Sequence, residues 1–219
     1  MTALTSVKKG AVLMKIYDIS MEIRNDMMVY KNQEQRRPRL EQTRKIHEEG
    51  VNESTLHINL HTGTHMDAQR HVLENGSTIE DIDLNKCITP CKVLDFTHLN
   101  DCISKEELMK KNIQKDDFIL LKTRNSFRDD FDFEFVYLNS DGAEYLQETG
   151  IKGVGIDSLG IERGQPGHMT HKALLSKDIV ILEGLRLKDI EEGEYILCAL
   201  PLKLRGGDGS PVRACLIRL

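Results

Sequence analysis

The sequence predicts an α/β fold, a single domain in which helices flank a mixed β-sheet. Strand-like and helix-like segments alternate over residues 90–185, which is typical of a sheet with some parallel pairing. Residues 194–202 and 211–219 read as two further strands near the C-terminus, and they favour antiparallel pairing. The apolar run FILLKT at residues 118–123 indicates a buried strand.

Local signals place the other elements in order along the chain. Residues 104–111 are expected to form a helix, because Ser104 as N-cap and Glu107 three residues later make a capping box. The remaining expected elements are strands at residues 15–20, 92–96, 154–156 and 180–184, a turn with a short helix at 76–84, a helix at 139–150 begun by Asn139 or Ser140 and ended by Gly150, and a short helix at 168–175.

Two segments leave a choice between a plain connection and a functional role. Residues 25–53 are long, polar and mixed in charge, so they form either a solvated loop or a lid over a pocket. Residues 124–126 directly follow the expected strand at 118–123, so they form either an ordinary turn or part of a site at the carboxyl end of a strand.

Composition excludes several classes of function. The 219 residues are 39% hydrophobic and 30% charged, which suits a soluble chain with a substantial core. A net charge of −5 argues against nucleic acid or an anionic membrane as partner. Because no apolar run approaches the roughly 18 residues of a membrane span and no signal peptide is evident, we expect a cytoplasmic location. Residues 1–13, ahead of Met14, are expected to be an N-terminal tail, and residues 14–219 the domain.

The cysteines indicate reduced thiols. Their number is five, which is odd, and no two form a CxxC pair. This pattern argues against a disulfide framework and against a cysteine zinc site. Cys198 and Cys215 stand in apolar, strand-like surroundings, so we expect them to fill the core.

Residues 56–72, LHINLHTGTHMDAQRHV, hold four of the eight histidines and an aspartate. All five polar candidates occupy odd positions, whereas the aliphatic residues occupy even ones. An extended chain would put these two sets on opposite faces, which predicts a half-buried strand whose polar face looks into a cavity. Burying so many unpaired polar groups would cost several kcal/mol unless a cation satisfied them. The stretch therefore predicts a metal site, with His57, His61, His65, Asp67 and His71 as the candidates.

The spacing within this stretch requires a bend. His61 and His65 are four apart, as on one face of a helix, but Thr62, Gly63 and Thr64 between them are poor helix formers. In a straight strand four residues span about 13 Å, which is too far for two imidazoles to share an ion. We therefore expect the chain to bend at Gly63.

A catalytic metal site needs ligands from a second segment, because catalytic zinc keeps one position open and a two-metal site needs more ligands than one stretch can supply. The candidates lie in the short helix at residues 168–175 and the apolar strand at 180–184. Glu183 ends that strand, where a carboxylate is costly unless it is paired. Both His168 and His171 could join it.

The stretch from His61 to Asp67, followed by His71, resembles the H-x-G-T-H-x-D-x-P-x-H signature of the cyclase-like metal-dependent hydrolases. This family includes bacterial kynurenine formamidases and isatin hydrolases, and the resemblance covers roughly residues 15–219. It implies a swivelling β/α/β-like fold. One position departs from the signature, since Gln69 replaces the proline and removes a fixed φ from the loop that carries His71.

The resemblance also implies roles for individual residues. The formamidases have a histidine twelve residues before a glutamate in a strand ending I-x-E, which selects His171 with Glu183 and leaves His168 as a surface or supporting residue. An aromatic in the segment equivalent to residues 25–53 stacks on the substrate, which implies Tyr30 as a substrate-binding residue. The implied ligand set has His61 and His65 on one ion, Asp67 and Glu183 as bridges, and His171 on the second ion.

The remaining histidines and the metal follow from chemistry. Hard carboxylates and borderline imidazoles without thiolates suit two Zn²⁺ ions, with Mn²⁺ as the alternative. His57 precedes the signature and is expected to be a supporting or structural residue, since a lone histidine is more often hydrogen-bonded than ligating. His47 and His98 lie in polar stretches and are expected to face water.

The implied function is hydrolysis of an aryl formamide, most simply N-formylkynurenine to kynurenine and formate in tryptophan catabolism. Isatin-type cyclic amide hydrolysis and a non-catalytic metal-binding domain are the alternatives. An amine leaving group needs a proton, and His71 has the chemistry and the face to donate it as the catalytic residue. The expected partners are a small-molecule amide and, because the mixed sheet is rich in edges, further copies of the chain in a homodimer or larger homo-oligomer.

Overall fold

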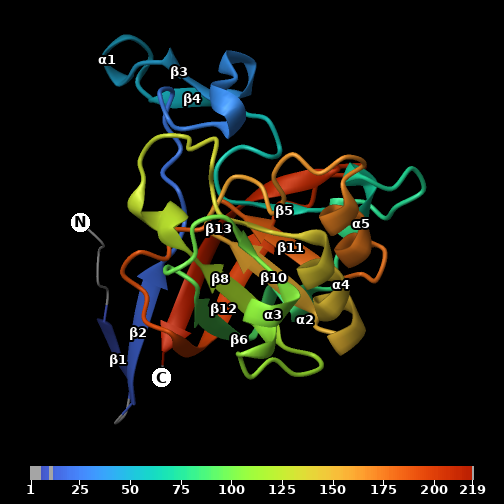
Figure 1. The fold of residues 1–219 in the computed structure, drawn as a ribbon. Coiled ribbons are helices and arrows are strands. Elements are labelled where there is room, and N and C mark those ends of the chain that lie inside the picture. Colours follow the sequence, from blue (N-terminus) through green and yellow to red (C-terminus); the bar gives the residue numbers. More distant parts are fainter. Residues whose placement is uncertain (1–5, 10–11, 219) are drawn as a thin grey trace.

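The apolar run at residues 118–123 forms β8 (Phe118–Lys122), a central strand of a mixed sheet that closes into a barrel (Figure 1). The structure is a computed structural model that describes residues 6–9 and 12–218. The strands succeed one another in the order β13-β12-β6-β8-β10-β11-β5, and β13 also pairs with β5, which closes the ring. The α/β class with a mixed sheet is therefore confirmed, with few helices outside the barrel.

The barrel combines parallel and antiparallel pairs. β6, β8, β10 and β11 run parallel, whereas β12, β13 and β5 pair antiparallel with their neighbours, as the strand-like C-terminal segments predicted. The other barrel strands are β5 (His65–Asp67), β6 (Ile88–Asp95), β10 (Gly153–Ile156), β11 (Val180–Glu183), β12 (Gly193–Pro201) and β13 (Gly209–Arg218). Outside the ring, β2 (Val12–Asp18) pairs with β13 and β1 (Ser6–Lys9) with β2.

Short helices cover one side of the barrel (Figure 1). They are α2 (Leu84–Cys87), α3 (Lys105–Met109), α4 (Ser140–Thr149) and α5 (Met169–Leu175), with the small parallel pair β7 (Cys102–Ile103) and β9 (Tyr137–Leu138) beside them. Asn139 is the N-cap of α4 and accepts a hydrogen bond from the Gly142 amide, and Gly150 ends the helix in the left-handed conformation. Five 3-10 turns complete the described elements, at Tyr30–Asn32, Glu34–Arg36, Gln69–His71, Ile79–Asp81 and Arg124–Phe127.

Two apolar layers explain why the run at β8 shows no alternation. Phe118 and Leu120 point into the barrel, where they pack with side chains from the surrounding strands. Ile119 and Leu121 point outward and pack beneath the helices. Because both faces of β8 are buried, every position of the strand is apolar until Lys122.

The same alternation puts the polar residues of β5 and β11 on the outer face. Met66 and Leu182 belong to the barrel interior. Asp67, one residue from Met66, and Glu183, one residue from Leu182, therefore face outward. Since α5 packs against β11 on that face, polar groups from all three elements can meet there.

Three local predictions are corrected. Residues 56–72 form no single half-buried strand: Glu53–His57 is the exposed strand β4, a loop follows, and only β5 joins the barrel. Residues 25–53 are no plain loop, because β3 (Arg39–Arg44), α1 (Ile46–Glu49) and β4 form a hairpin that stands away from the barrel (Figure 1). The capping box is absent, because the Ser104 hydroxyl donates to the Glu106 carboxylate instead.

The N-terminal segment and two of the cysteines lie on strands of the sheet. Part of the expected tail, Ser6–Lys9, pairs with β2, although most of residues 1–13 lies outside the described part. Cys198 and Cys215 face each other across β12 and β13 as half-buried free thiols, so they fill the core only in part. Among the described helices, none has the length and apolar character needed to cross a bilayer.

Candidate metal centre

The candidate site begins with the antiparallel pairing of β5 and β11. Its register puts His65 directly opposite Glu183 and Asp67 opposite Ile181. His65 and Asp67 are two residues apart and therefore share a face. The pairing brings two acids and one imidazole, from segments more than 100 residues apart in the sequence, onto the same buried patch.

Two glycines allow this pairing to continue into the adjoining loops. Gly63 has φ +70°, which confirms the expected bend before His65. Gly184 has φ +68°, and a Cβ there would lie 2.3 Å from the Gly63 carbonyl oxygen. Thr64 joins the same loops, because its hydroxyl lies 2.5 Å from the Gly184 carbonyl oxygen and accepts a hydrogen bond of 2.8 Å from the Met21 amide. The close approach of these two loops holds His65 and Glu183 in register.

The two acids are each placed between the same two histidines. Nε2 of His65 lies 3.5 Å from Asp67 Oδ1 and 3.3 Å from Glu183 Oε2. Nε2 of His171, which α5 supplies, lies 3.5 Å from Asp67 Oδ2 and 3.4 Å from Glu183 Oε1. Each carboxylate thus presents one oxygen to each histidine.

These separations fit ligands of a common cation. With metal–ligand bonds of about 2.1 Å, two ligands of a tetrahedral zinc ion are about 3.4 Å apart. Asp67 Oδ2 is buried and has no hydrogen-bond partner among the described residues, although a buried oxygen normally has one. Three sets of possible ligand atoms lie within 4.8 Å of one another: His65, Asp67 and Glu183; His61, Asp67 and His71; and Glu162, His168 and His171. The donor set therefore fits divalent cations.

A hydrogen bond orients the ring of His65, and an ion-pair contact orients that of His171. Nδ1 of His65 lies 2.9 Å from the Gly63 carbonyl oxygen, which can only accept, so Nδ1 carries the proton and Nε2 is left as a free acceptor. Nδ1 of His171 lies 3.1 Å from Glu162 Oε1. A carboxylate or carbonyl on the far nitrogen is the usual way in which proteins orient a metal-binding histidine.

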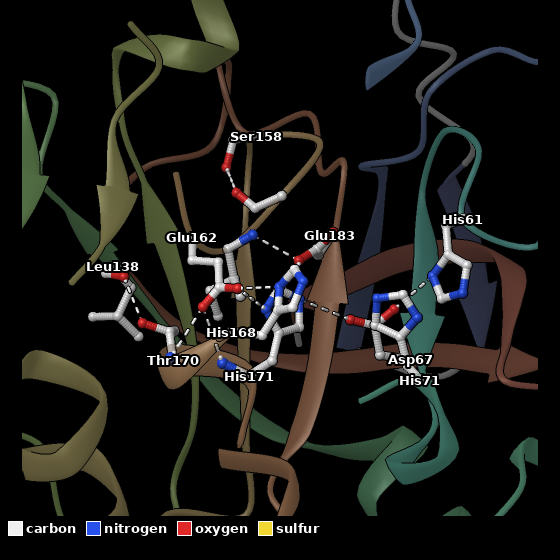
Figure 2. A network of polar contacts seen from close by, with 12 residues as sticks. His61, Asp67, His71, Leu138, Ser158, Glu162, His168, Thr170, His171 and Glu183 are labelled. Atoms are coloured by element: carbon white, nitrogen blue, oxygen red, sulfur yellow. Dashed lines mark hydrogen bonds and ion pairs between the residues drawn. The ribbon is translucent and has the colours of Figure 1, made fainter. Parts of the chain in front are cut away.

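Glu162 also determines where α5 begins. Its Oε2 accepts hydrogen bonds from the amides of Thr170 and His171, in the first turn of the helix. Its Oε1 lies 2.6 Å from Nδ1 of His168 (Figure 2). One carboxylate therefore anchors the helix N-terminus and the ring of His171 together.

His61 completes the cluster from the loop before β5. Its Nδ1 lies 2.9 Å from Asp67 Oδ1 and its Nε2 lies 3.0 Å from Asp208 Oδ2. A Cβ at Gly209 would lie 2.8 Å from the ring, so only glycine leaves room for it there. Burial opposes protonation, but the hydrogen bonds and charges of Asp67 and Asp208 outweigh it and raise the pKa of His61 to about 9.

The electrostatics of the cluster favour positive charge at its centre. Burial opposes ionisation of His171, yet its contacts with the carboxylates of Asp67, Glu162 and Glu183 raise its pKa well above the usual value. Burial and the Asp67 charge oppose ionisation of Glu183, yet His171 and His65 lower its pKa to about 2. The acids are therefore ionised at neutral pH, and a cation can replace the protons on the imidazoles.

His71 has a different environment. Its ring centroid lies 4.0 Å from that of His61 and 5.6 Å from that of His171, and its Nδ1 lies 4.0 Å from Asp208 Oδ2. Burial lowers the pKa of His71. The charges of Asp67 and Glu183 act to raise this pKa, but repulsion from His61 and His171 offsets part of their effect. His71 is therefore neutral at pH 7 and is free to exchange a proton.

A cavity of about 850 Å³ opens directly onto this cluster. His61, His65, His71 and His171 all reach it, and Tyr30 forms part of its wall. The Tyr30 ring is held 5.3 Å from the ring of Phe131. The structure thus brings every residue of the predicted site except Asp67 to the wall of one cavity, and Asp67 contacts the lining histidines His61, His65 and His171 from behind.

Other candidates from the sequence lie elsewhere. His57 is exposed on β4, where it makes no hydrogen bond or ion pair with the cluster in the described part of the chain, so it is no supporting residue of the site. His47 and His98 face water, as expected. His168 is largely exposed and contacts Glu162, which matches the expectation of a surface or supporting residue.

Residues 124–126 form a structural turn. The Ser126 hydroxyl and the Thr123 amide donate to Oδ2 of buried Asp157, at 2.6 and 2.7 Å. Burial raises the pKa of Asp157 to about 6, although the hydrogen bonds from Ser126 and Thr123 act in the opposite direction. This network joins the ends of β8 and β10 and contains none of the metal-cluster residues.

Sequence reasoning missed Glu162 and Asp208. Both stand in glycine-containing loops, in the runs LGIERG and GGDGS, where the periodicity of strands and helices provides no signal. The one signal in the sequence that could have identified these two residues is an acid close to glycines and ahead of a strand or helix. The closure of the barrel brings these two loops next to the cluster, where Glu162 contacts His171 and Asp208 contacts His61.

Comparison with known proteins identifies the family of the chain. The family described as "Putative cyclase" matches residues 17–163. A kynurenine formamidase of Bacillus thuringiensis subsp. konkukian (strain 97-27) is 34% identical over 168 residues, which are 76% of this chain and 80% of that protein.

Solved structures share the fold. A potential metal-dependent hydrolase with cyclase activity has a TM-score of 0.87 and 48% identity, covering 93% of this chain and 98% of that one. Isatin hydrolase A from Labrenzia aggregata, bound to benzyl benzoate, has a TM-score of 0.80 at 23% identity over 93% of each chain, a likeness that concerns the fold. From the family match and the similarity to the formamidase, the chain belongs to the cyclase family.

Proposed function

We propose that the protein is a metal-dependent hydrolase that cleaves the C–N bond of aryl formamides, with N-formylkynurenine as the representative substrate. The observation that carries this proposal is the pair of buried acids, Asp67 and Glu183, each with one oxygen toward His65 and one toward His171. The relative named kynurenine formamidase supports the substrate class.

The proposed centre holds two Zn²⁺ ions, with Mn²⁺ as the alternative, because imidazoles and carboxylates without thiolates suit both. Asp67 and Glu183 would bridge, His61 and His65 would complete one position, and His171 would complete the other. Asp67 Oδ2, buried without a hydrogen-bond partner in the described part of the chain, supports its role as a bridge. Bound cations of this kind supply Lewis-acid polarisation of the amide and activation of water.

His71 is the proposed proton donor to the departing amine. An arylamine cannot leave readily as an anion, so the C–N bond breaks as the nitrogen receives a proton. His71 lines the cavity beside the ligand cluster, and its lowered pKa suits a group that takes up a proton and releases it again near neutral pH. Tyr30, on the cavity wall, would pack against the aryl ring of the substrate.

A non-catalytic metal-binding domain would need no access to its ions. Here a cavity of about 850 Å³ adjoins the cluster, which is the size of a small-molecule site. The open cavity therefore favours the hydrolase over the binding domain.

The first prediction concerns the reaction. With Zn²⁺ or Mn²⁺, the protein is expected to hydrolyse N-formylkynurenine with a higher kcat/KM than isatin. Formate release and ring opening, measured side by side at equal metal loading, test this. Faster opening of isatin would reverse the substrate assignment, and turnover of neither compound would contradict the proposed function.

The second prediction separates proton transfer from ligation. His71→Ala is expected to keep its metal content and to lose about 10²–10⁴-fold in kcat, the range of general acid catalysis. Asp67→Ala is expected to lose metal, because both positions share this residue. Metal analysis after dialysis, with turnover of the same samples, measures both. Metal loss in His71→Ala would assign it as a ligand instead.

The third prediction concerns Glu162. Glu162→Gln is expected to weaken metal binding about 10- to 100-fold, since the orienting carboxylate of His171 loses its charge. Competition with a chelator measures the affinity. Glu74→Gln is the matched control, because Glu74 lines the same cavity and makes no ion pair with a ligand histidine among the described residues. Equal affinities in the two variants would remove Glu162 from this role.

We also propose that the chain forms a homo-oligomer through the β3–β4 hairpin. Leu40 and Leu56 lie opposite each other on this hairpin at 51% and 46% exposure, and Ile46 and Val51 are similarly exposed. A second copy would remove these aliphatic side chains from water. A cytoplasmic location stays a prediction from the sequence.

Light scattering tests the assembly. A dimer or larger particle is expected, and the double substitution Leu40→Ser with Leu56→Ser should shift it toward the monomer. Met109→Ser, at an exposed position on α3, is the control. A monomeric wild-type protein at micromolar concentration would contradict the proposal.

A further inference from the structure

The cavity is rich in basic side chains that have no ion-pair partner among the described residues. Four basic side chains line it, those of Lys31, Arg36, Arg70 and Lys172. None of them makes an ion pair within 4.0 Å in the described part of the chain, although the chain as a whole carries a net charge of −5. Besides Glu162 and Glu183, which contact the cluster histidines, Glu74 is the one acid among the described residues that line the cavity. Such an arrangement attracts anions to the cavity although the net charge of the whole protein is negative.

Arg36 is the most constrained of the four. Its carbonyl oxygen accepts a hydrogen bond of 2.8 Å from the Thr62 hydroxyl, which ties it to the residue after His61. Its Nε donates to Gln33 Oε1 at 2.9 Å, which fixes the guanidinium plane. Nη1 and Nη2 have no hydrogen-bond partner among the described residues. These two nitrogens form the edge that binds a carboxylate with two parallel hydrogen bonds.

The turn that presents Arg36 is shaped for this position. Lys31 and Asn32 are both left-handed, with φ of 54° and 53°, a conformation that is unfavourable for residues with a side chain. The turn places Arg36 with its guanidinium carbon 5.8 Å from the centroid of the Tyr30 ring. An aromatic wall and a free guanidinium edge therefore stand together at the cavity.

We infer that Arg36 binds a carboxylate of the substrate, so that the protein selects anionic aryl amides over neutral ones. This inference rests on the proposed amide hydrolysis and assigns its specificity. Arg36 holds the carboxylate while the aryl ring packs against Tyr30 and the amide lies at the metal cluster. Lys31, Arg70 and Lys172 add to the attracting field without fixed geometry, because their side chains are exposed.

The test uses a pair of substrates that differ in the carboxylate charge and one methyl group, 4-(2-formamidophenyl)-4-oxobutanoate and its methyl ester. The wild-type holoenzyme is expected to favour the acid about 10- to 100-fold in kcat/KM, the range of a charge-assisted hydrogen-bonded pair. Arg36→Met should abolish this preference by raising KM for the acid at least tenfold more than KM for the ester. Arg218→Met is the control, because Arg218 ends β13 and pairs with Glu191 at 3.5 Å, outside the cavity.

A second readout does not depend on turnover. The corresponding aminophenyl products, acid and methyl ester, are titrated into the same proteins, and the acid should bind at least tenfold more tightly to wild type and to Arg218→Met but not to Arg36→Met. An acid preference that persists in Arg36→Met would mean that the metal ions hold the carboxylate, and it would overturn the inference. Equal treatment of acid and ester by wild type would also overturn it, while leaving amide hydrolysis intact.

The two proposals fail separately. If binding of the acid product requires Arg36 but no formamide is hydrolysed, the carboxylate subsite is supported and the proposed reaction is contradicted. If both formamides are hydrolysed equally, the reaction stands and the subsite falls.

Discussion

Two carboxylates buried side by side are the constraint on which this structure depends. Asp67 and Glu183 are at most 4% exposed, and like charges at such proximity oppose each other's ionisation. Uncompensated, the arrangement would cost many kcal/mol, and a carboxyl group would remain protonated rather than bear it. The imidazoles of His65 and His171 compensate it by facing one oxygen of each acid. In the protein without cations, His171, whose pKa lies well above the usual value, supplies positive charge; the same geometry accepts divalent ions in place of its proton.

The rest of the site keeps this arrangement in register. The β5–β11 ladder sets His65 against Glu183, and the contact of Gly63 with Gly184 leaves no room for a side chain that would separate the two loops. Glu162 orients His171 from outside the cluster, as the Gly63 carbonyl does for His65. These outer contacts matter because a ligand set is useful only when its lone pairs point to one place.

The candidate metal ligands and the residues that face the substrate cavity come from different kinds of element. The acids and His65 come from strands whose opposite faces carry the barrel core, so their backbone positions are as rigid as the core itself. His71, Tyr30 and Arg36 come instead from 3-10 turns and lie at the cavity. Residues that meet the substrate thus stand on loops that can differ among relatives without disturbing the metal centre. Gln69, in place of the signature proline, lies in such a turn, and His71 at the end of the same turn lines the cavity.

Local chemistry was sufficient for the residues whose partners are near in the sequence or whose pattern is periodic. The strand of Phe118–Lys122, the cap and end of α4 and the bend at Gly63 each follow from a few adjacent residues. The residues alone left His168 and His171 both open as partners of Glu183, and only the family resemblance implied His171. Alternation misled at residues 56–72, where a hairpin strand, a loop and a barrel strand happen to share one parity. Glu162 and Asp208 escaped detection, as did the free guanidinium of Arg36 in the cavity. Their roles arise from which loops the closed barrel brings together, and the free energy of that closure is distributed over the whole core, so no single stretch of sequence carries it.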